Sequence, residues 1–416
     1  MVDIAVLGYG VVGSGVVEVI NTNQMSINEK AGEEIRVKKI LDIRDFSDDP
    51  NKDIITNNAD EIFEDESIKI IVETIGGTGA ALEYTKRAFL AGKHVVSSNK
   101  ELVALHGPEL LKMAKENNVY YLFEASVGGG IPIIRPLNQC LAANEIYSIT
   151  AILNGTTNYI ITQMKDSGKS FSSALENAKK NGYAEANPIA DIEGLDTCRK
   201  IAILSSIAFN EFVDCRNIYT EGISKLSLLD FEYALQMNSV IKLIAISEKK
   251  NDKIHARVSP AIINNSHPLA NVDDVFNAIL VRGNAIGEVM FYGRGAGKLP
   301  TASAVVADII DIIKHVDSNG RNIWKRKDYN NIEDIDNMET RFFVRVSAGD
   351  IEQAKNLIIR EFGEVNFIYL NKKETAKEIA FVTCKDTEKA HKDKFSNLMN
   401  SGLIDNIVSS IRILDE

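Results

Sequence analysis

The chain has 416 residues, of which 45% are hydrophobic and 25% charged, and it contains 27 glycines against 8 prolines. This composition is typical of globular proteins and excludes fibrous and wholly disordered classes. With 58 acidic residues against 47 basic ones, the net charge of −11 gives no electrostatic reason to bind nucleic acid or acidic membranes. Because one hydrophobic core stops growing near roughly 250–300 residues, we expect two or three domains.

The 4 cysteines lie far apart and form no CxxC pair. This spacing predicts neither a zinc site nor a disulfide framework, and it favours a reducing compartment. The first residues enter an apolar strand pattern without the basic segment and cleavage site of a signal peptide. No apolar run reaches the roughly 18–20 residues of a membrane span. We therefore expect a cytoplasmic protein with no membrane partner and no nucleic-acid partner.

The first third of the chain alternates short β-branched runs with amphipathic stretches, which is typical of βαβ units and a parallel sheet. The pattern predicts an α/β fold, a Rossmann-type doubly wound sheet over residues 1–135 that binds a dinucleotide and is completed by residues 300–318. We predict strands at 3–8, 37–43, 68–73, 94–97 and 120–124, and helices at 10–21, 79–91, 108–116 and 301–314.

From about Tyr147 strands and helices mix, which predicts an α+β domain over residues 136–299. Its strands are expected near 149–153, 253–260 and 278–283, and its helices near 157–167, 172–181 and 196–209. A polar, aperiodic stretch at 319–339 is typical of a linker. Residues 340–416 then follow the order βαββαβ, which predicts a small ferredoxin-like domain.

A glycine fingerprint occupies the point where the first strand meets the first helix. The first glycine permits a tight turn, the second lets the backbone approach a pyrophosphate, and the third allows close packing of helix and strand. The helix N-terminus adds unpaired N–H groups for the anion. The alternative is a glycine-rich turn in an unrelated α/β domain. The residues of the fingerprint are Gly8, Tyr9, Gly10, Val11, Val12 and Gly13.

At the end of the second predicted strand, two residues give conflicting signals about the cofactor. Asp42 offers a carboxylate for the ribose hydroxyls of NAD, whereas Arg44 offers a cation for the 2′-phosphate of NADP. Either side chain can equally be a solvated strand end. The loop at 45–50 is acidic, which disfavours a phosphate and favours NAD.

Two lysines and a group of carboxylates carry the predicted chemistry. Lys100 follows a strand at the carboxyl edge of the sheet, where ligands bind in open α/β folds. Asp196 and Lys200 share one helix face with apolar residues, so we expect them to point inward, although a surface ion pair is the commoner arrangement. Nearby carboxylates suit an ammonium group, and a lysine can polarise or protonate a carbonyl while a cofactor supplies hydride. The pattern favours carbonyl reduction on an amino-bearing substrate.

Several motif blocks, in the same order along nearly the whole chain, resemble those of homoserine dehydrogenases. The resemblance implies reduction of L-aspartate 4-semialdehyde to L-homoserine with NADPH or NADH, on the route to threonine, methionine and isoleucine. It also implies a homodimer or higher homo-oligomer assembled through the middle, substrate-binding domain. The blocks lie at 8–13, 98–100, 124–132, 154–158, 185–200 and 291–297.

The resemblance also implies residue roles. Lys200 and Lys100 would serve the carbonyl and the proton transfer, Glu185 and Asp196 would bind the substrate, and Asp191 would support them. Main-chain oxygens of Glu124, Val127, Gly129 and Ile131 would bind sodium, although the glycines at 128–130 read by themselves as a flexible hinge. The implied cofactor-binding residues are Gly8, Tyr9, Gly10, Val11, Val12, Gly13, Asp42, Arg44, Thr74, Ser98, Lys100, Gly182, Glu185, Gly295 and Gly297.

The C-terminal unit resembles an ACT domain, which in this family can sense threonine. Its loop at 347–352 lacks the glycine usual after the aspartate, so an amino-acid effector and a purely structural or dimerising role both remain open. Asn187 stands where the family usually has an aspartate. Two rival functions are an acylating semialdehyde dehydrogenase, which needs a cysteine nucleophile, and a non-catalytic nucleotide sensor.

Overall fold

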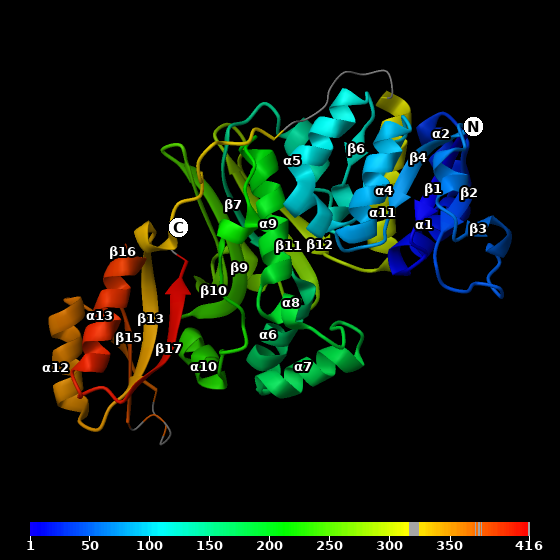
Figure 1. The fold of residues 1–416 in the computed structure, drawn as a ribbon. Coiled ribbons are helices and arrows are strands. Elements are labelled where there is room, and N and C mark those ends of the chain that lie inside the picture. Colours follow the sequence, from blue (N-terminus) through cyan, green and yellow to red (C-terminus); the bar gives the residue numbers. More distant parts are fainter. Residues whose placement is uncertain (316–323, 371, 373–374, 376, 415–416) are drawn as a thin grey trace. The chain divides into compact units, whose positions relative to one another are not determined.

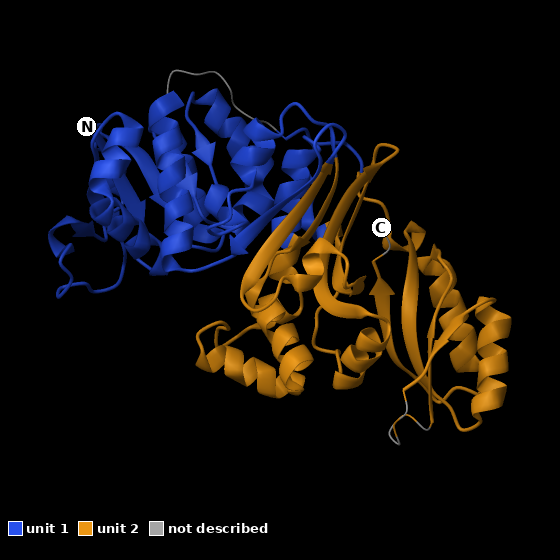
Figure 2. Ribbon diagram, turned by 180° about the vertical axis from the view of Figure 1, so that it is seen from behind, with its two compact units in different colours: residues 1–146, 199–216, 283–329 blue, residues 147–198, 217–282, 330–416 orange. Residues whose placement is uncertain are grey.

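The structure, a computed structural model, describes residues 1–315, 324–370, 372, 375 and 377–414 (Figure 1). The chain forms two compact units, coloured separately in Figure 2. Unit 1 comprises residues 1–146, 199–216 and 283–329, and unit 2 comprises residues 147–198, 217–282 and 330–416. Residues 316–318 of the predicted completing segment and 319–323 of the predicted linker lie outside the described residues.

Unit 1 contains a parallel sheet with the strand order β3-β2-β1-β4-β5-β6. The order reverses direction between β1 and β4, which is the point where nucleotides bind in doubly wound folds. The predicted Rossmann-type sheet is therefore confirmed. Its strands are β1 (Val2–Leu7), β2 (Ile35–Leu41), β3 (Ile55–Thr56), β4 (Ile68–Glu73), β5 (His94–Ser97) and β6 (Tyr121–Leu122).

Helices cover the sheet of unit 1 because one side of each is apolar. Val16 and Ile20 of α1 share a buried cluster with Ile4 of β1 and with Val305 and Ile309 of α11, so α1 and α11 pack on the same face. Helices α4 and α5 pack against each other. The elements are α1 (Val11–Thr22), α2 (Gln24–Ala31), α3 (Asp60–Phe63), α4 (Gly79–Leu90), α5 (Lys100–Glu116), β12 (Gly287–Arg294) and α11 (Lys298–His315).

Some predicted elements of unit 1 differ from the observed ones. Helix α5 begins at Lys100 rather than at residue 108, because the Asn99 side chain accepts a hydrogen bond from Leu102 N and caps the helix, while Pro108 lies inside it. The strand expected at 120–124 is only two residues long, because the chain turns into a 3-10 helix at Glu124–Ser126. Helix α2 was not predicted, since it buries only Ile27 and Ala31.

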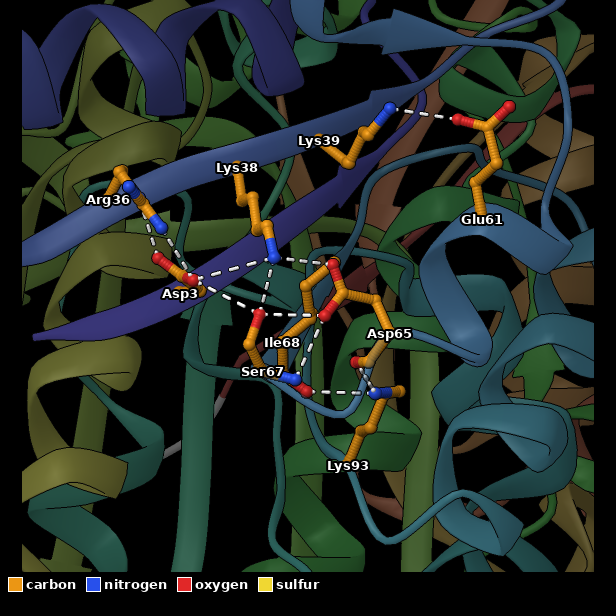
Figure 3. Close-up of polar contacts among 9 residues, drawn as sticks. All are labelled: Asp3, Arg36, Lys38, Lys39, Glu61, Asp65, Ser67, Ile68 and Lys93. Atoms are coloured by element: carbon orange, nitrogen blue, oxygen red, sulfur yellow. Dashed lines mark hydrogen bonds and ion pairs between the residues drawn. The ribbon is translucent and has the colours of Figure 1, made fainter.

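The amino edge of this sheet carries a charged network (Figure 3). Asp3 of β1 accepts hydrogen bonds from Arg36 Nε at 2.7 Å and Nη2 at 2.8 Å. Lys93 is buried, which lowers its pKa, and its Nζ donates to the main-chain oxygens of Asp65 and Ile68 at 2.7 and 2.9 Å. Because ligands bind at the opposite, carboxyl edge, this network holds strands together and lies away from the predicted site.

Unit 2 contains a mixed sheet with the order β11-β7-β9-β10-β17-β13-β15-β14. Strands β9 and β10 form a long antiparallel pair, in register from Lys250↔Lys253 to Ser239↔Asn264. Neither β9 nor α10 was predicted from the sequence. Helix α9 (Leu195–Ala208) begins in unit 2, and its residues from 199 onward belong to unit 1. The other elements before the C-terminal part are β7 (Ile146–Ile152), α6 (Gly155–Ser167), α7 (Phe171–Lys180), α8 (Ile189–Ile192), β8 (Tyr219–Thr220), α10 (Leu228–Gln236), β9 (Ser239–Lys250), β10 (Lys253–Asn264) and β11 (Phe276–Gly283).

The C-terminal module, residues 339–414, follows the predicted βαββαβ order and has the sheet order β17-β13-β15-β14. Strand β17 also pairs in parallel with β10, so the module continues the sheet of unit 2, as the red and green strands of Figure 1 show. No helix among the described residues is long and apolar enough to cross a membrane. The module comprises β13 (Glu339–Ser347), α12 (Ile351–Phe362), β14 (Asn366–Ile368), β15 (Glu378–Val382), β16 (Asp386–Thr387), α13 (Glu388–Asn400) and β17 (Asn406–Ile413).

Candidate active site

The glycine fingerprint forms a tight turn between β1 and α1. Gly8 has a φ of +91°, a conformation that L side chains rarely adopt. A Cβ on Gly13 would lie 2.0 Å from Gly8 O, so only glycine lets α1 begin this close to the turn, whereas Gly10 faces open space. Thr74 Oγ1 donates to Leu7 O at 3.0 Å and to Gly8 O at 2.8 Å and fixes the loop from β4. The turn and the start of α1 therefore fit a pyrophosphate.

The two candidate cofactor-selecting residues bind each other. Arg44 donates through its main-chain N, Nε and Nη2 to the Asp42 carboxylate at 3.0, 3.0 and 2.7 Å. Tyr9 N, inside the fingerprint, donates to Asp42 Oδ2 at 2.7 Å. These contacts, above all the one with the Arg44 side chain, hold the pKa of Asp42 well below its usual range. A ribose hydroxyl would therefore compete with Arg44 for the Asp42 carboxylate.

Glu73, the last residue of β4, was not predicted as a site residue. It is fully buried, and this burial raises its pKa. Its Oε1 accepts from Ile75 N at 2.9 Å, and its Oε2 accepts from Ser97 Oγ at 2.6 Å. Ser97 Oγ in turn accepts from Asn99 N at 3.0 Å. Glu73 therefore joins the loop after β4 to the start of α5, and the signal in the sequence was a carboxylate ending an apolar strand.

Lys100 is the first residue of α5, directly after the Asn99 cap, and Ser98 N donates to Glu73 O at 3.3 Å. Both Ser98 and Lys100 therefore lie at the carboxyl edge of the sheet, the same edge as Gly8. Lys200 is buried in α9 at 7% exposure. Glu101 follows Lys100 in the chain, and Arg199 precedes Lys200. Arg199 Nη2 donates to Glu101 Oε1 at 3.0 Å, and this ion pair links α5 and α9 within unit 1.

Two of the predicted substrate carboxylates in unit 2 share one partner. Asn154 Nδ2 donates to Asp191 Oδ1 at 2.8 Å and to Asp196 Oδ2 at 2.9 Å. Its Oδ1 accepts from Thr157 N at 2.8 Å, so Asn154 caps α6. Glu185 and Gly182 lie on an exposed segment after α7. Asn154 was not predicted as a site residue, because an amide between two carboxylates leaves no spacing pattern.

The loop predicted to bind a cation is tightly packed. The Glu124 carboxylate accepts from the main-chain N of Ile133, Ile134 and Arg135 at 2.7, 2.8 and 2.6 Å. A Cβ on Gly129 would lie 2.4 Å from Gly295 O, so this loop lies directly against the loop of Gly295 and Gly297. Gly130 N donates to Arg294 O at 3.2 Å.

A cation in this loop would depend on main-chain oxygens. Among the described residues, no group of three or more His, Cys, Asp and Glu side chains could hold a metal ion. Val127 and Ile131, two of the four predicted main-chain ligands, are buried within the same loop. Hard cations prefer oxygen ligands such as main-chain carbonyls, so the sodium assignment depends on these four carbonyl oxygens and stays a prediction.

Two family models match the chain, "Homoserine dehydrogenase, NAD binding domain" at residues 8–124 and "Homoserine dehydrogenase" at residues 132–310. The homoserine dehydrogenase of Synechocystis sp. is 37% identical and covers 99% of both chains. That of Neisseria gonorrhoeae is also 37% identical, over 99% of this chain and 98% of its own.

Solved structures agree with these relatives. The crystal structure of a homoserine dehydrogenase from Thiobacillus denitrificans matches with a TM-score of 0.90 and 34% identity, over 100% of this chain and 98% of that one. A hyperthermophilic archaeal homoserine dehydrogenase in complex with NADPH matches with a TM-score of 0.64 and 31% identity, over 77% of this chain and 99% of that one. Since relatives align along nearly its entire length, the chain belongs to the homoserine dehydrogenase family.

Proposed function

We propose how the residues above divide the work of an NAD(P)-dependent homoserine dehydrogenase. The enzyme is an oxidoreductase of amino-acid biosynthesis that interconverts L-homoserine and L-aspartate 4-semialdehyde by direct hydride transfer. The observation that carries the proposal is the shared amide of Asn154, which orients the carboxylates of Asp191 and Asp196 at 2.8 and 2.9 Å at the start of the helix that bears Lys200.

In the proposed site the substrate ammonium binds to the carboxylates of Asp191, Asp196 and Glu185. Opposite charges within about 4–6 Å of each other favour the ionised forms of both partners. Lys200 and Lys100 bind the substrate oxygen and move the alcohol proton, and the burial of Lys200 strengthens this interaction because water is excluded. With the neutral Asn187 in this loop, less negative charge faces the amine than an aspartate at that position would supply.

The nicotinamide cofactor, when bound, accepts or donates the hydride. We assign its pyrophosphate to the turn of Gly8 to Gly13, with Thr74 fixing that turn, and its nicotinamide end to the loop of Gly295 and Gly297. Ser98, Lys100, Gly182 and Glu185 complete the proposed contacts. The Asp42–Arg44 pair decides between NAD and NADP, and the acidic loop after it favours NAD. The archaeal relative that binds NADPH supports a cofactor of this class.

A sodium ion is proposed at the main-chain oxygens of Glu124, Val127, Gly129 and Ile131. The support is the packed loop, in which the Glu124 side chain fixes the turn and Gly129 contacts the loop of Gly295. Bound there, the ion would brace the loop that faces the nicotinamide. Activity measured in sodium chloride and in a bulky organic cation at equal ionic strength tests this assignment, and equal rates in both would contradict it.

The domain roles are proposals of the same kind. Residues 1–135 with 300–318 would bind the dinucleotide, residues 136–299 would bind substrate and form a homodimer or higher homo-oligomer, and 319–339 would act as a linker. Residues 340–416 are proposed as an ACT-like regulatory domain with an amino-acid effector, supported by the sheet order β17-β13-β15-β14. The proposed location is the cytoplasm, on the sequence argument from the scattered cysteines.

Absorbance at the reduced-nicotinamide band, with the full chain and L-homoserine, tests the catalytic assignment. Lys200→Met should abolish turnover while cofactor binding remains, because the variant keeps the side-chain volume and loses the charge. Lys112→Met, on an exposed lysine of α5, is the control and should leave turnover unchanged. Cofactor binding without turnover in the unaltered chain would favour the sensor. Phosphate-dependent reduction of the cofactor with L-aspartate 4-semialdehyde, lost after thiol blocking and absent with L-homoserine, would favour the acylating enzyme.

A further inference from the structure

Two strands share one edge of β10 in unit 2. Strand β8 pairs in parallel with Arg257 and Val258, and β17 of the C-terminal module pairs in parallel with Ala261 and Ile262. The two strands therefore follow one another along the same edge of the sheet. Any side chain that bridges them connects the C-terminal module to the segment that follows β8.

Arg412 of β17 makes this bridge. Its side chain is 5% exposed and donates through Nε and Nη2 to Glu388 of α13 at 2.6 and 2.9 Å. Its Nη1 donates to Glu221 Oε2, directly after β8, at 2.6 Å. The guanidinium also stacks over the Tyr219 ring, 4.7 Å from its centre. A bidentate pair with one carboxylate and a third bond to another satisfies this buried cation from both sides.

Glu221 begins a segment in backbone contact with the turn that carries Asp191. Glu221 N donates to Val258 O at 2.8 Å, and Ile223 N donates to Ile192 O at 2.8 Å. A Cβ on Gly222 would lie 2.2 Å from Ile192 O, so no side chain fits between the two segments. A shift of the segment at 221–223 must therefore move Ile192, the neighbour of Asp191.

The turn passes this constraint to the proposed substrate carboxylate. Asp191 N donates to Pro188 O and Gly194 N donates to Asp191 O, both at 3.0 Å, so the turn is closed by its own hydrogen bonds. The side chain of Asp191 is then fixed by Asn154. A continuous chain of contacts therefore runs from Arg412 through Glu221, Gly222 and Ile192 to Asp191.

We propose that Arg412 and Glu221 are positioning residues, through which the C-terminal module sets the affinity of the Asp191 carboxylate for the amino-bearing substrate. This inference rests on the proposed function, since it needs Asp191 to contact that substrate. Displacements of about 1 Å in a binding group already weaken a productive site strongly. The pair does not touch substrate, so its loss should act on substrate affinity and leave the cofactor site of unit 1 unchanged.

The test compares two carboxylates, each of which pairs with its own buried arginine of the C-terminal module: Glu221 with Arg412, and Glu378 with Arg345. In Glu221→Gln the charge of Arg412 is still balanced by Glu388, so the fold is retained. Glu378→Gln is the matched control, because Arg345 likewise keeps a second partner, Asp230 at 2.8 Å, and that pair leads to α10 instead of to the Asp191 turn. Glu221→Ala and Arg412→Lys extend the series, and thermal unfolding of each variant verifies that it is folded.

We expect Glu221→Ala to raise the KM for homoserine about three- to tenfold and Glu221→Gln to raise it less, with the KM for the cofactor and kcat changed by less than about twofold. Arg412→Lys combined with Glu221→Ala should raise the homoserine KM little beyond Glu221→Ala alone, since the contact between residues 412 and 221 is already broken. Loss of the bidentate bond to Glu388 should instead lower the unfolding temperature of the double variant. An unchanged homoserine KM in a folded Glu221→Ala variant would overturn this inference but not the proposed function. An equal rise of the homoserine KM in Glu378→Gln would do the same. Absence of turnover in the unaltered chain would instead overturn the proposed function on which it rests.

Discussion

Single buried or paired charges decide the behaviour of the dinucleotide site at the residue scale. Asp42 has its carboxylate bound by Arg44 and by Tyr9 N, so the charge that we propose selects the cofactor is tied to the fingerprint turn itself. Glu73 is a buried carboxylate that receives hydrogen bonds from both sides of the carboxyl edge. Neither residue acts alone, because the hydrogen bonds that each carboxyl group accepts also fix a loop.

The Asp42–Arg44 pair predicts opposite cofactor shifts. We compare kcat/KM for NAD with kcat/KM for NADP. Arg44→Ala should raise the NAD-to-NADP ratio about tenfold, because the freed Asp42 accepts ribose hydroxyls and repels a 2′-phosphate. Asp42→Asn should lower the ratio, because Arg44 is then available to the phosphate. Lys39→Ala, which removes an ion pair between β2 and Glu61 of α3, is the control and should not change this ratio. Shifts in the same direction for both variants would contradict this role.

Glu73 predicts a pH-dependent stability. Burial raises its pKa in the folded chain, so the folded state holds a proton that the unfolded chain releases near its ordinary pKa of about 4.3. The stability of the unaltered chain should therefore fall, relative to Glu73→Gln, as pH rises from about 4 through the raised pKa, and then level off. Urea unfolding of both proteins between pH 4 and 8 measures this difference.

Glu109→Gln supplies a control of opposite sign. The hydrogen bond from Lys86 lowers the pKa of Glu109, so its contribution is present at neutral pH and is lost as pH falls. The unaltered chain should become slightly more stable than Glu109→Gln as pH rises, by less than about 1 kcal/mol because the pair is partly exposed. A difference between Glu73→Gln and the unaltered chain that is independent of pH would show that folding does not raise the pKa of Glu73.

At the scale of elements, periodicity explains which parts of the fold could be predicted. The strands and helices of unit 1 alternate cleanly, and the fingerprint glycine at Gly8 is required by a positive φ, so both were predictable. Strand β9 is buried almost continuously from Ser239 to Ile246, so it shows no period of two. Asn154 and Glu73 find their partners only after folding brings distant segments together, and sequence spacing carries no trace of that.

Lys242 in β9 predicts a further effect at this scale. It is fully buried, and its Nζ donates to Val272 O at 2.5 Å and to Asp273 Oδ1 at 2.7 Å, which fixes the loop before β11. Lys242→Met should lower the free energy of unfolding by about 1–3 kcal/mol, because the loop loses both bonds. Lys165→Met, on the more exposed lysine that pairs with Asp273, should lower it by less than about 1 kcal/mol. Denaturant unfolding measures both values. Equal decreases in the free energy of unfolding for the two variants would show that the burial of Lys242 does not strengthen its bonds.

At the scale of the whole molecule, the C-terminal module belongs to unit 2 and shares its sheet. Strand β17 lies between β10 and β13, so backbone hydrogen bonds continue from the middle sheet into the module. Arg345 joins β13 to Asp230 of α10 and to Glu378, with only 2% of its side chain exposed. An effector bound to the module would therefore act on strands already paired with the substrate-binding part of the chain.

Deleting residues 340–416 tests this integration. The deletion exposes the edge of β10 at Ala261 and Ile262, and it leaves the buried Asp230 without its cation, which costs about 3–5 kcal/mol. We expect the shortened chain to unfold at a lower temperature and to associate through the freed edge. The dissociation constant for NAD(H), measured by fluorescence, should stay within about twofold, because the glycine turn and Thr74 belong to unit 1. Unchanged thermal unfolding and homoserine KM would mean that the module is only tethered, whereas a lost cofactor site would mean that it also supports unit 1.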